Sequence, residues 1–366
     1  MKKIMIIFSY PAPYRTEIIK TIEGQYETDM FFLRENGDER NSDWFSKGKY
    51  VFLDTAEGLA IYNQCVKNLT DYNLVVFYEF SFIEAVKLIL KCRAKKVPYI
   101  LNCDGVMLFR HGNFIRDVIK KIVIKGAAAY FASGTHAKDY FLKYGAKEEK
   151  IFIHNFTALR KKDILEKPIF LDEKRRLREK LSLPLNAKIC IAVGRYIPLK
   201  RYDTLLRLWK GMPQDTVLLL IGGGPEKELY ETIIKQENLS NVILQDFHPF
   251  EELLEYYKAA DLFVHPTSYD VWGLVVNEAL ACGLPVVATD TCVAGLELIK
   301  NGENGFVSHL GDDDDFINKI STVLNDDGLR EEMSLKSIET IRPFYIENMI
   351  ASQMDTINKI LANGNE

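Results

Sequence analysis

The order of its short apolar segments is the feature that most constrains how this chain folds. Twelve such segments, six in residues 1–165 and six in the remainder, are separated by stretches with helical spacing. They read KIMIIF, ETDMFFL, NLVVFY, PYILNC, AAYFAS and KIFIHN, then AKICIAVG, TVLLLIGG, NVILQDF, DLFVHPT, LPVVATD and NGFVSH. Continuous apolar strands that alternate with helices are typical of parallel sheets covered on both faces. The sequence therefore predicts two doubly wound α/β domains, each presenting the carboxyl ends of its strands to a ligand.

A stretch rich in lysine, arginine and glutamate separates the two series, between Phe156 and Leu185. At 366 residues the chain is long for one domain and sufficient for two. We place the first domain at residues 1–165 and the second at residues 166–344. Residues 345–366 carry apolar side chains at helical spacing, and we expect this last helix to pack back on the first domain.

The sequence favours a cytoplasmic protein. Its start, MKKIMIIF, resembles a signal peptide, but the apolar run is shorter than the roughly 7–15 residues that such a peptide needs. No apolar stretch approaches the roughly 18 residues of a membrane span. The six cysteines show no CxxC pair and no zinc spacing, which is typical of reduced thiols in the cytoplasm.

The net charge of −4 conceals opposite charges in the two halves. Residues 1–165 hold 26 basic and 19 acidic side chains, whereas the remaining residues hold 21 and 32. This asymmetry predicts a different partner for each half. The acidic second half argues against a nucleic-acid binder.

Two glycine-containing turns of the second half indicate a phosphate ligand. In VGRYIPLKR, Gly194 permits a sharp turn after a strand, and Arg195 and Lys200 then offer a fork and a point charge suited to a diphosphate. In IGGGPEKEL, Gly223 permits close approach of the backbone to a ligand, although the segment does not fit GxGxxG. The alternative is that both cations are solvated loop residues.

The segment HPTSYDVWGLVVNEAL is the most informative. A helix is expected to begin at Gly273, so that the amides of Gly273, Leu274 and Val275 form an anion site at its N-terminus. Asp270, in the preceding loop, is expected to face a donor sugar. Glu278 lies among apolar helix residues, where a carboxylate needs a polar partner such as ribose hydroxyls. The alternative is that both acids are surface residues.

Two further features remain open. The turn from Asp246 to His248 is placed to contact a nucleobase through its backbone, but Phe247 within it is equally a candidate for the core. The acidic run from Asp312 to Asp315 favours a solvated helix start over a metal site.

These segments resemble the retaining glycosyltransferases of family 4, whose GT-B fold has two Rossmann-like domains facing a central cleft. The family's diphosphate clamp corresponds to Gly194, Arg195 and Lys200, and its two acids separated by seven residues to Asp270 and Glu278, with Asp in place of the more usual first Glu. The resemblance implies a nucleotide-diphosphate sugar donor (UDP or GDP), no metal or other cofactor, and a saccharide or lipid-linked acceptor in surface polysaccharide, lipopolysaccharide or glycolipid synthesis.

The first half matches the family less closely. Its loop SYPAPYR, with Tyr14 and Arg15, resembles a proline-rich variant of bacterial polysaccharide enzymes. Asp104 and Gly105 stand at the strand end where the family carries a histidine, and His111 follows in the loop. We expect Asp104 beside the reacting sugar and the other four on the acceptor side. The alternatives are an ordinary Asp-Gly turn and an exposed loop histidine.

The predicted catalytic residues are therefore Asp104, Arg195, Lys200 and Asp270. Two basic stretches with apolar residues, 86–96 and 114–125, suit an anionic membrane surface, although a solvated face over a core explains them equally well. Two other functions stay open: a sugar-nucleotide epimerase with the same fold, and a non-catalytic partner subunit.

Overall fold

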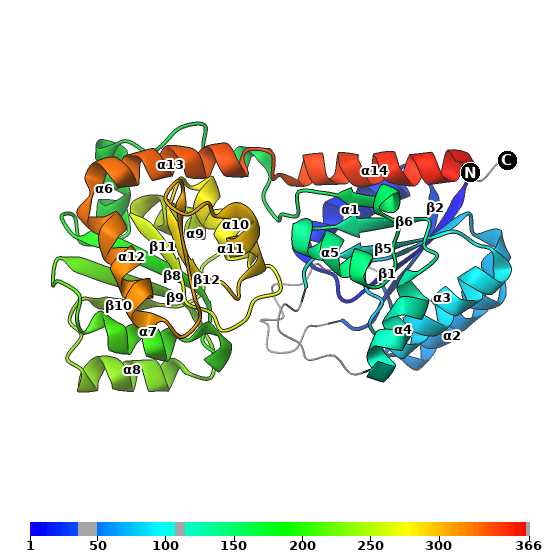
Figure 1. Ribbon diagram of the computed structural model, residues 1–366, viewed down its shortest axis with the longest axis horizontal. Coiled ribbons are helices and arrows are strands. Elements are labelled where there is room, and N and C mark those ends of the chain that lie inside the picture. Colours follow the sequence, from blue (N-terminus) through cyan, green and yellow to red (C-terminus); the bar gives the residue numbers. More distant parts are fainter. Residues whose placement is uncertain (36–49, 107–113, 364–366) are drawn as a thin grey trace. The chain divides into compact units, whose positions relative to one another are not determined.

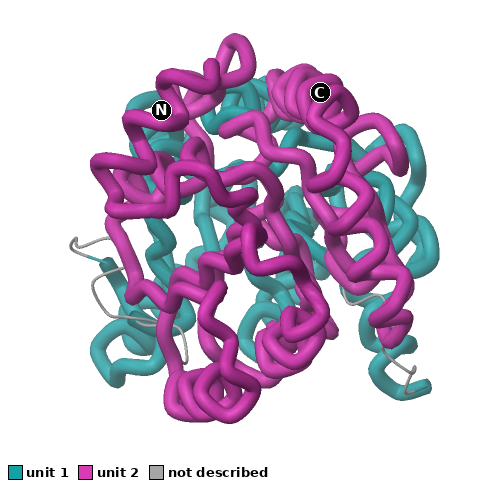
Figure 2. Tube along the Cα trace, turned by 90° about the vertical axis from the view of Figure 1, so that its left-hand side faces the viewer, with its two compact units in different colours: residues 1–158, 345–366 teal, residues 159–344 magenta. Residues whose placement is uncertain are grey.

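The computed structural model describes residues 1–35, 50–106 and 114–363. The chain divides into two compact units, residues 1–158 with 345–366, and residues 159–344 (Figure 2). The boundary lies seven residues before the expected one. The amide of Leu165 donates a 2.9 Å hydrogen bond to the carbonyl of Ala281, so the connecting segment is already held by the second unit.

The first unit is built on a parallel sheet in the order β3-β2-β1-β4-β5-β6-β7 among the described residues (Figure 1). The strands are β1 (Lys3–Phe8), β2 (Glu27–Phe32), β3 (Val51–Phe52), β4 (Leu74–Phe77), β5 (Tyr99–Cys103), β6 (Ala129–Ala132) and β7 (Ile151–Ile153). The helices are α1 (Thr16–Glu23), α2 (Ala56–Lys67), α3 (Ile83–Lys95), α4 (Phe114–Ile124) and α5 (Thr135–Lys143). The strand order reverses between β1 and β4, the position where open α/β sheets bind ligands.

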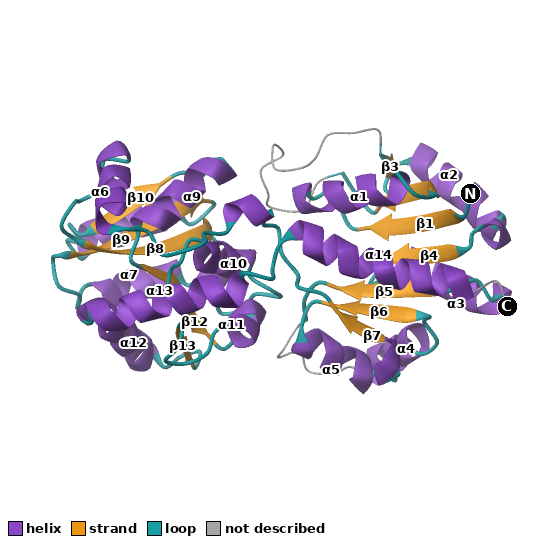
Figure 3. Ribbon diagram, turned by 90° about the horizontal axis from the view of Figure 1, so that it is seen from above, coloured by secondary structure: helices purple, strands orange, loops and turns teal. Residues whose placement is uncertain are grey.

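The last helix of the chain, α14 (Ile346–Asn363), belongs to this first unit. It lies beside α1 on one face of the sheet (Figure 3). Ile350, Met354 and Ile357 of α14 share one apolar core with Ile18 of α1 and Phe131 of β6. A segment that follows the second unit in sequence therefore completes the core of the first.

The second unit repeats the architecture with the order β10-β9-β8-β11-β12-β13, again all parallel. Its strands are β8 (Lys188–Arg195), β9 (Thr216–Gly223), β10 (Val242–Gln245), β11 (Leu262–His265), β12 (Val286–Thr289) and β13 (Gly305–Ser308). Its helices are α6 (Leu171–Lys180), α7 (Tyr202–Trp209), α8 (Lys227–Gln236), α9 (Phe250–Ala259), α10 (Leu274–Ala281), α11 (Val293–Leu298), α12 (Asp313–Asn325) and α13 (Asp327–Ile341).

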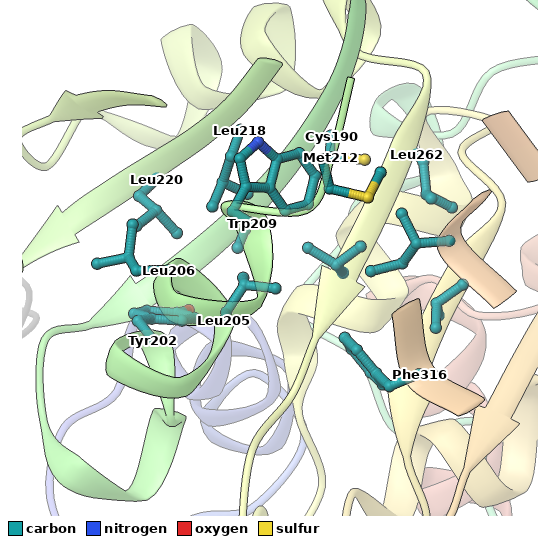
Figure 4. Close-up of a cluster of buried hydrophobic side chains, with 14 of the residues drawn as sticks. Cys190, Tyr202, Leu205, Leu206, Trp209, Met212, Leu218, Leu220, Leu262 and Phe316 are labelled. Atoms are coloured by element: carbon teal, nitrogen blue, oxygen red, sulfur yellow. The ribbon is translucent and has the colours of Figure 1, made fainter. Parts of the chain in front are cut away.

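An apolar cluster under β8 and β9 fixes the strand ends that carry the predicted site. Trp209 and Leu206 of α7 are fully buried against Leu218 and Leu220 of β9 (Figure 4). Burial of side chains of this size stabilises by about 1.5–3 kcal/mol each. The loop between β8 and α7, which includes Lys200, is thus anchored at both of its ends.

The prediction of two doubly wound domains is confirmed. Asp312 caps α12 by accepting from the amide of Asp315, so the acidic run begins a helix as expected. The sequence missed β3, which has two residues and is too short to show a pattern. Within the described residues, no helix is both long and apolar enough to cross a membrane.

Candidate functional site

In the second unit, two glycine-containing strand ends meet without side chains between them. A Cβ atom on Gly222 of β9 would lie 1.8 Å from the carbonyl oxygen of Gly194 on β8, and one on Gly194 would lie 2.9 Å from the hydroxyl of Tyr202. Both glycines have φ of +156°, which side chains rarely adopt. Arg195 follows at the end of β8 and is half-buried.

Phe247 lies beside this pair of strands and is not a core residue. Its side chain is 54% exposed, which corrects the core alternative for this position. A Cβ atom on Gly223 would approach its ring to 3.1 Å, so the ring packs on the backbone of Gly223. An exposed aromatic ring held against a glycine is available to stack on a planar ligand.

Lys200 and Asp270 form an ion pair, with Nζ of Lys200 2.7 Å from Oδ2 of Asp270. Their side chains are only 13% and 18% exposed. Burial alone would raise the pKa of Asp270, but Lys200 and the neighbouring His265 hold it well below its usual range. The structure thus brings together two residues that the sequence placed in separate motifs.

His265, at the end of β11, completes this cluster and was not predicted. It is fully buried, and its Nε2 lies 3.3 Å from the same Oδ2 of Asp270. Burial and the nearby Lys200 lower the pKa of His265. Its position at the carboxyl end of an apolar strand, where parallel sheets carry functional residues, is the signal that could have identified it.

The backbone of Asp270 is fixed by the loop that follows β12. The amide of Asp270 donates to the carbonyl of Thr291 at 3.1 Å, and the amide of Ala294 donates to the carbonyl of Trp272 at 2.7 Å. The hydroxyl of Thr291 in turn donates to the carbonyl of Thr267 at 2.6 Å. These hydrogen bonds fix the backbone from which the Asp270 carboxylate extends.

Helix α10 begins at Leu274, four residues after Asp270. Gly273 is its N-cap residue with φ of +99°, and a Cβ atom there would lie 2.7 Å from Sγ of Cys292 and 3.6 Å from Oδ2 of Asp270. The amides of Leu274 and Val275 have no acceptor within the helix, because the first turn of any helix lacks them. The predicted anion site and the Lys200–Asp270 pair therefore lie at one place.

Glu278 lies further along α10 and is half-buried. Tyr257 of α9 donates a 2.9 Å hydrogen bond to its Oε2. Burial raises the pKa of Glu278 to about 7, against the smaller opposing effect of that hydrogen bond. A carboxyl with this pKa in a loop-lined site is a typical functional-site feature.

The first unit holds a separate polar cluster around Asp104. Nη2 of Arg15 lies 2.6 Å from Oδ2 of Asp104, and Nδ2 of Asn102 donates to Oδ1 at 2.6 Å. Both carboxylate oxygens are thus engaged. Arg15 is 5% exposed and lies over the rings of Tyr14 and Tyr78 at 5.3 and 5.0 Å, so it orients Asp104 from inside the protein.

This placement corrects the expectation for Arg15, because a buried guanidinium does not face an acceptor. Tyr14 and Gly105 are half-buried near the same cluster, and His111 lies outside the described residues. A cavity of about 10 Å³ is lined by Arg15, Asp104 and Gln353 of α14, among others, which is room for roughly one water molecule.

His154, at the end of β7, is a further buried polar residue that was not predicted. It is 2% exposed, and neither ring nitrogen has a hydrogen-bond partner among the described residues. Burial lowers its pKa to about 4, so the ring is neutral. Across the described parts of both units, no three acidic, histidine or cysteine side chains are grouped so as to hold a metal ion.

Comparison with known sequences finds similarity over the second unit. Residues 173–340 match the family model described as glycosyl transferases group 1. A D-inositol 3-phosphate glycosyltransferase of Corynebacterium efficiens is 34% identical over 180 residues, which cover 46% of this chain and 42% of that protein. An N-acetyl-alpha-D-glucosaminyl L-malate synthase of Bacillus anthracis is 26% identical over 52% of this chain and 50% of its own length. The chain thus matches about half the length of such relatives.

Solved structures of related fold cover nearly all of this chain. Anabaena HepE in complex with UDP superposes with a TM-score of 0.77 at 16% identity, covering 98% of this chain and all of that one. Sucrose-phosphate synthase of Thermosynechococcus elongatus gives 0.73 at 19% identity, covering 99% of this chain and all of its own. Both share the fold of two Rossmann-like domains. The chain therefore has the GT-B fold, and residues 173–340 within it match the model of glycosyl transferases group 1.

Proposed function

We propose that this protein is a retaining glycosyltransferase that moves a hexose from a UDP- or GDP-sugar to a saccharide or lipid-linked acceptor in surface polysaccharide or glycolipid synthesis. The observation that carries the proposal is the Lys200–Asp270 pair at the N-terminus of α10. At this place a cation and the helix amides can bind a diphosphate, and a carboxylate can accept hydrogen bonds from the attached sugar. The group 1 domain over residues 173–340 supports the donor side.

The reaction requires stabilisation of a leaving diphosphate while positive charge grows on the sugar ring. Arg195, Lys200 and the amides of Leu274 and Val275 supply preorganised positive charge for that diphosphate. Because these groups suffice, we expect no metal or other cofactor. The acceptor attacks the face from which the diphosphate leaves, which retains the anomeric configuration and requires no protein nucleophile.

Two carboxylates of the second unit are assigned to the donor. Asp270 accepts hydrogen bonds from hydroxyls of the transferred sugar, and Glu278 accepts from the ribose. In the first unit, Asp104 contacts the acceptor as a fixed carboxylate, because Arg15 and Asn102 already hold both of its oxygens. Gly105, Tyr14 and His111 are assigned to the same side.

Helix α4 supports a lipid-linked acceptor at the inner face of a membrane. Five of its apolar side chains are exposed, with exposed fractions between 39% and 82%: Phe114, Ile115, Val118, Ile119 and Ile122. Arg116 and Lys121 are exposed on the same helix. Exposed apolar side chains interspersed with cations suit an anionic lipid surface, which burial under a core would not explain.

The test is a thermal-shift screen against UDP, GDP, ADP, CMP and their common sugar conjugates. A ligand that binds the native state raises its melting temperature by mass action. We expect one nucleoside diphosphate and its sugar conjugate to raise the melting temperature of the wild type. The same ligands should leave the melting temperature of Arg195→Ala unchanged and raise that of Arg207→Ala as in the wild type. Arg207 is the matched control because it is an exposed arginine of the same unit.

Incubation of the selected sugar nucleotide with acceptor extracts then separates the alternatives. Transfer with release of the nucleoside diphosphate supports the proposal, whereas an epimerised sugar nucleotide without transfer indicates an epimerase. A well-folded wild type that no nucleotide stabilises indicates a non-catalytic subunit.

A further inference from the structure

Among the described residues, the ring of His265 has one hydrogen-bond partner, the carboxylate of Asp270. Nε2 lies 3.3 Å from Oδ2, the oxygen that Lys200 contacts at 2.7 Å. Nδ1 has no hydrogen-bond partner among the described residues. Burying an imidazole nitrogen without a hydrogen-bond partner costs free energy. The one hydrogen bond that this ring keeps therefore calls for an explanation.

The protonation state of this pair follows from its surroundings. Burial and the charge of Lys200 lower the pKa of His265, so the ring is neutral at neutral pH. Asp270 is ionised and can only accept hydrogen bonds. Nε2 therefore carries the proton, and this N–H donates a hydrogen bond to Oδ2.

The donors Lys200 and His265 contact the same carboxylate oxygen of Asp270 and leave the other to accept from a ligand. Lys200 and His265 both reach Oδ2, and within the described part of the chain no donor reaches Oδ1. The Asp270 side chain remains 18% exposed, so a ligand can reach it.

His265 is the rigid member of the pair of donors. Its ring lies on that of Phe263 with centroids 5.9 Å apart and planes 20° apart, on a fully buried strand. The ammonium of Lys200, by contrast, is a point charge on a flexible stem and imposes little direction. Without the imidazole, the short carboxylate could rotate about its bond to Cβ while keeping its contact with Lys200.

We propose that His265 is a positioning residue for the donor sugar, which fixes the carboxylate of Asp270 so that Oδ1 accepts a hydrogen bond from a sugar hydroxyl. This inference rests on the proposed function. It concerns the sugar and not the nucleotide, because Arg195, Lys200 and the α10 amides are left in place when His265 is changed.

The test compares nucleotide and sugar-nucleotide binding in matched variants by calorimetry, with UDP against UDP-glucose and GDP against GDP-mannose as probes. His265→Phe removes the donor and keeps a ring of similar size. We expect it to weaken the sugar nucleotide about tenfold, the effect of one hydrogen bond to a charged group, and to change the nucleoside diphosphate by less than about twofold. His265→Gln returns an N–H near the position of Nε2 and should restore affinity to within about threefold.

His309→Phe is the control, because His309 also contacts a carboxylate of the second unit, Asp290 at 2.6 Å, but is exposed. It should change neither affinity. If His265→Phe lowers the affinities for the nucleoside diphosphate and for the sugar nucleotide by the same factor, or changes neither, the inference is overturned. The proposed function would remain intact. Failure of every probe to bind the wild type would overturn the proposed function and this inference with it.

Discussion

The hydroxyl of Tyr257 donates a 2.9 Å hydrogen bond to Oε2 of Glu278, joining α9 to α10 beneath the candidate donor site. Burial outweighs this bond and raises the pKa of the carboxyl from 4.5 to about 7. In the native state Glu278 therefore binds more protons than in the unfolded chain between these two values. By linkage, its ionisation removes stability as the pH rises through about 7.

Glu278→Gln, which cannot ionise, should consequently melt above the wild type at pH 8 by roughly 5–10 °C and much closer to it at pH 5. Thermal denaturation at several pH values measures the difference. Glu303→Gln is the control, since Glu303 is exposed and lies 3.8 Å from Lys300. A difference that stays constant from pH 5 to pH 8 would show that Glu278 does not titrate in this range.

Breaking the Lys200–Asp270 pair should destabilise the ligand-free protein. Lys200→Met leaves the carboxylate of Asp270 largely buried without its cation, and we expect a loss of about 3 kcal/mol, measured by calorimetry of the second unit's transition. Adding Asp270→Asn to Lys200→Met should recover most of that loss, because no uncompensated charge remains.

Lys210→Met provides the comparison, since Lys210 pairs with Glu237 at the same 2.7 Å but is 66% exposed. An exposed pair of this kind contributes at most about 1 kcal/mol. Equal losses for Lys200→Met and Lys210→Met would contradict the assignment of a buried pair.

Membrane binding should depend on α4. Ile115→Ser combined with Ile119→Ser removes two apolar side chains that are 68% and 43% exposed, while every cation of the helix stays. We expect at least a fivefold loss of sedimentation with phosphatidylglycerol vesicles and an unchanged melting temperature. The matched variant Leu59→Ser with Ile61→Ser alters two apolar residues of α2 that are 38% and 42% exposed, and it should bind as the wild type does. Unaltered sedimentation of the α4 variant would assign this face to another partner.

The core formed by α14 predicts that a C-terminal substitution destabilises the N-terminal unit. Ile357 is fully buried, and Ile357→Ala should cost about 2–5 kcal/mol. Hydrogen exchange resolved by peptide should show the loss in β1 and β4 and spare β8 and β9. Asp355→Ala, on the exposed side of the same helix, should leave exchange unchanged. Faster exchange in β8 and β9 instead would contradict the division into units.

The sequence predicted the strands and the groups of residues near their ends, because both follow from local patterns. Gly194 and Lys200 were recognised in one motif, and Asp270 and Gly273 in another. Their contacts were not predicted, since the Lys200–Asp270 pair joins residues 70 positions apart. The same limit applies to Arg15 and Asp104, which are 89 positions apart.

Burial was the second property that local patterns could not supply. Arg15 reads as a loop cation in the sequence, yet the rings of Tyr14 and Tyr78 enclose it. For Phe247 the sequence left a nucleobase contact and a place in the core equally open, and the side chain is more than half exposed. In both cases the exposure of the side chain depends on segments distant in the sequence, such as those of Tyr78 and Gly223, whose positions local patterns do not show.

The position of α14 also bears on how the protein is made. Since residues 345–366 complete the first unit, synthesis from the N-terminus delivers every strand of that unit early but its covering helix last. The second unit is one continuous segment of the chain, so it can fold while the ribosome is still translating the residues that follow it. During that interval the part of the apolar face that α14 covers stays exposed, and a nascent chain stalled before residue 345 would present it to chaperones or to neighbouring chains.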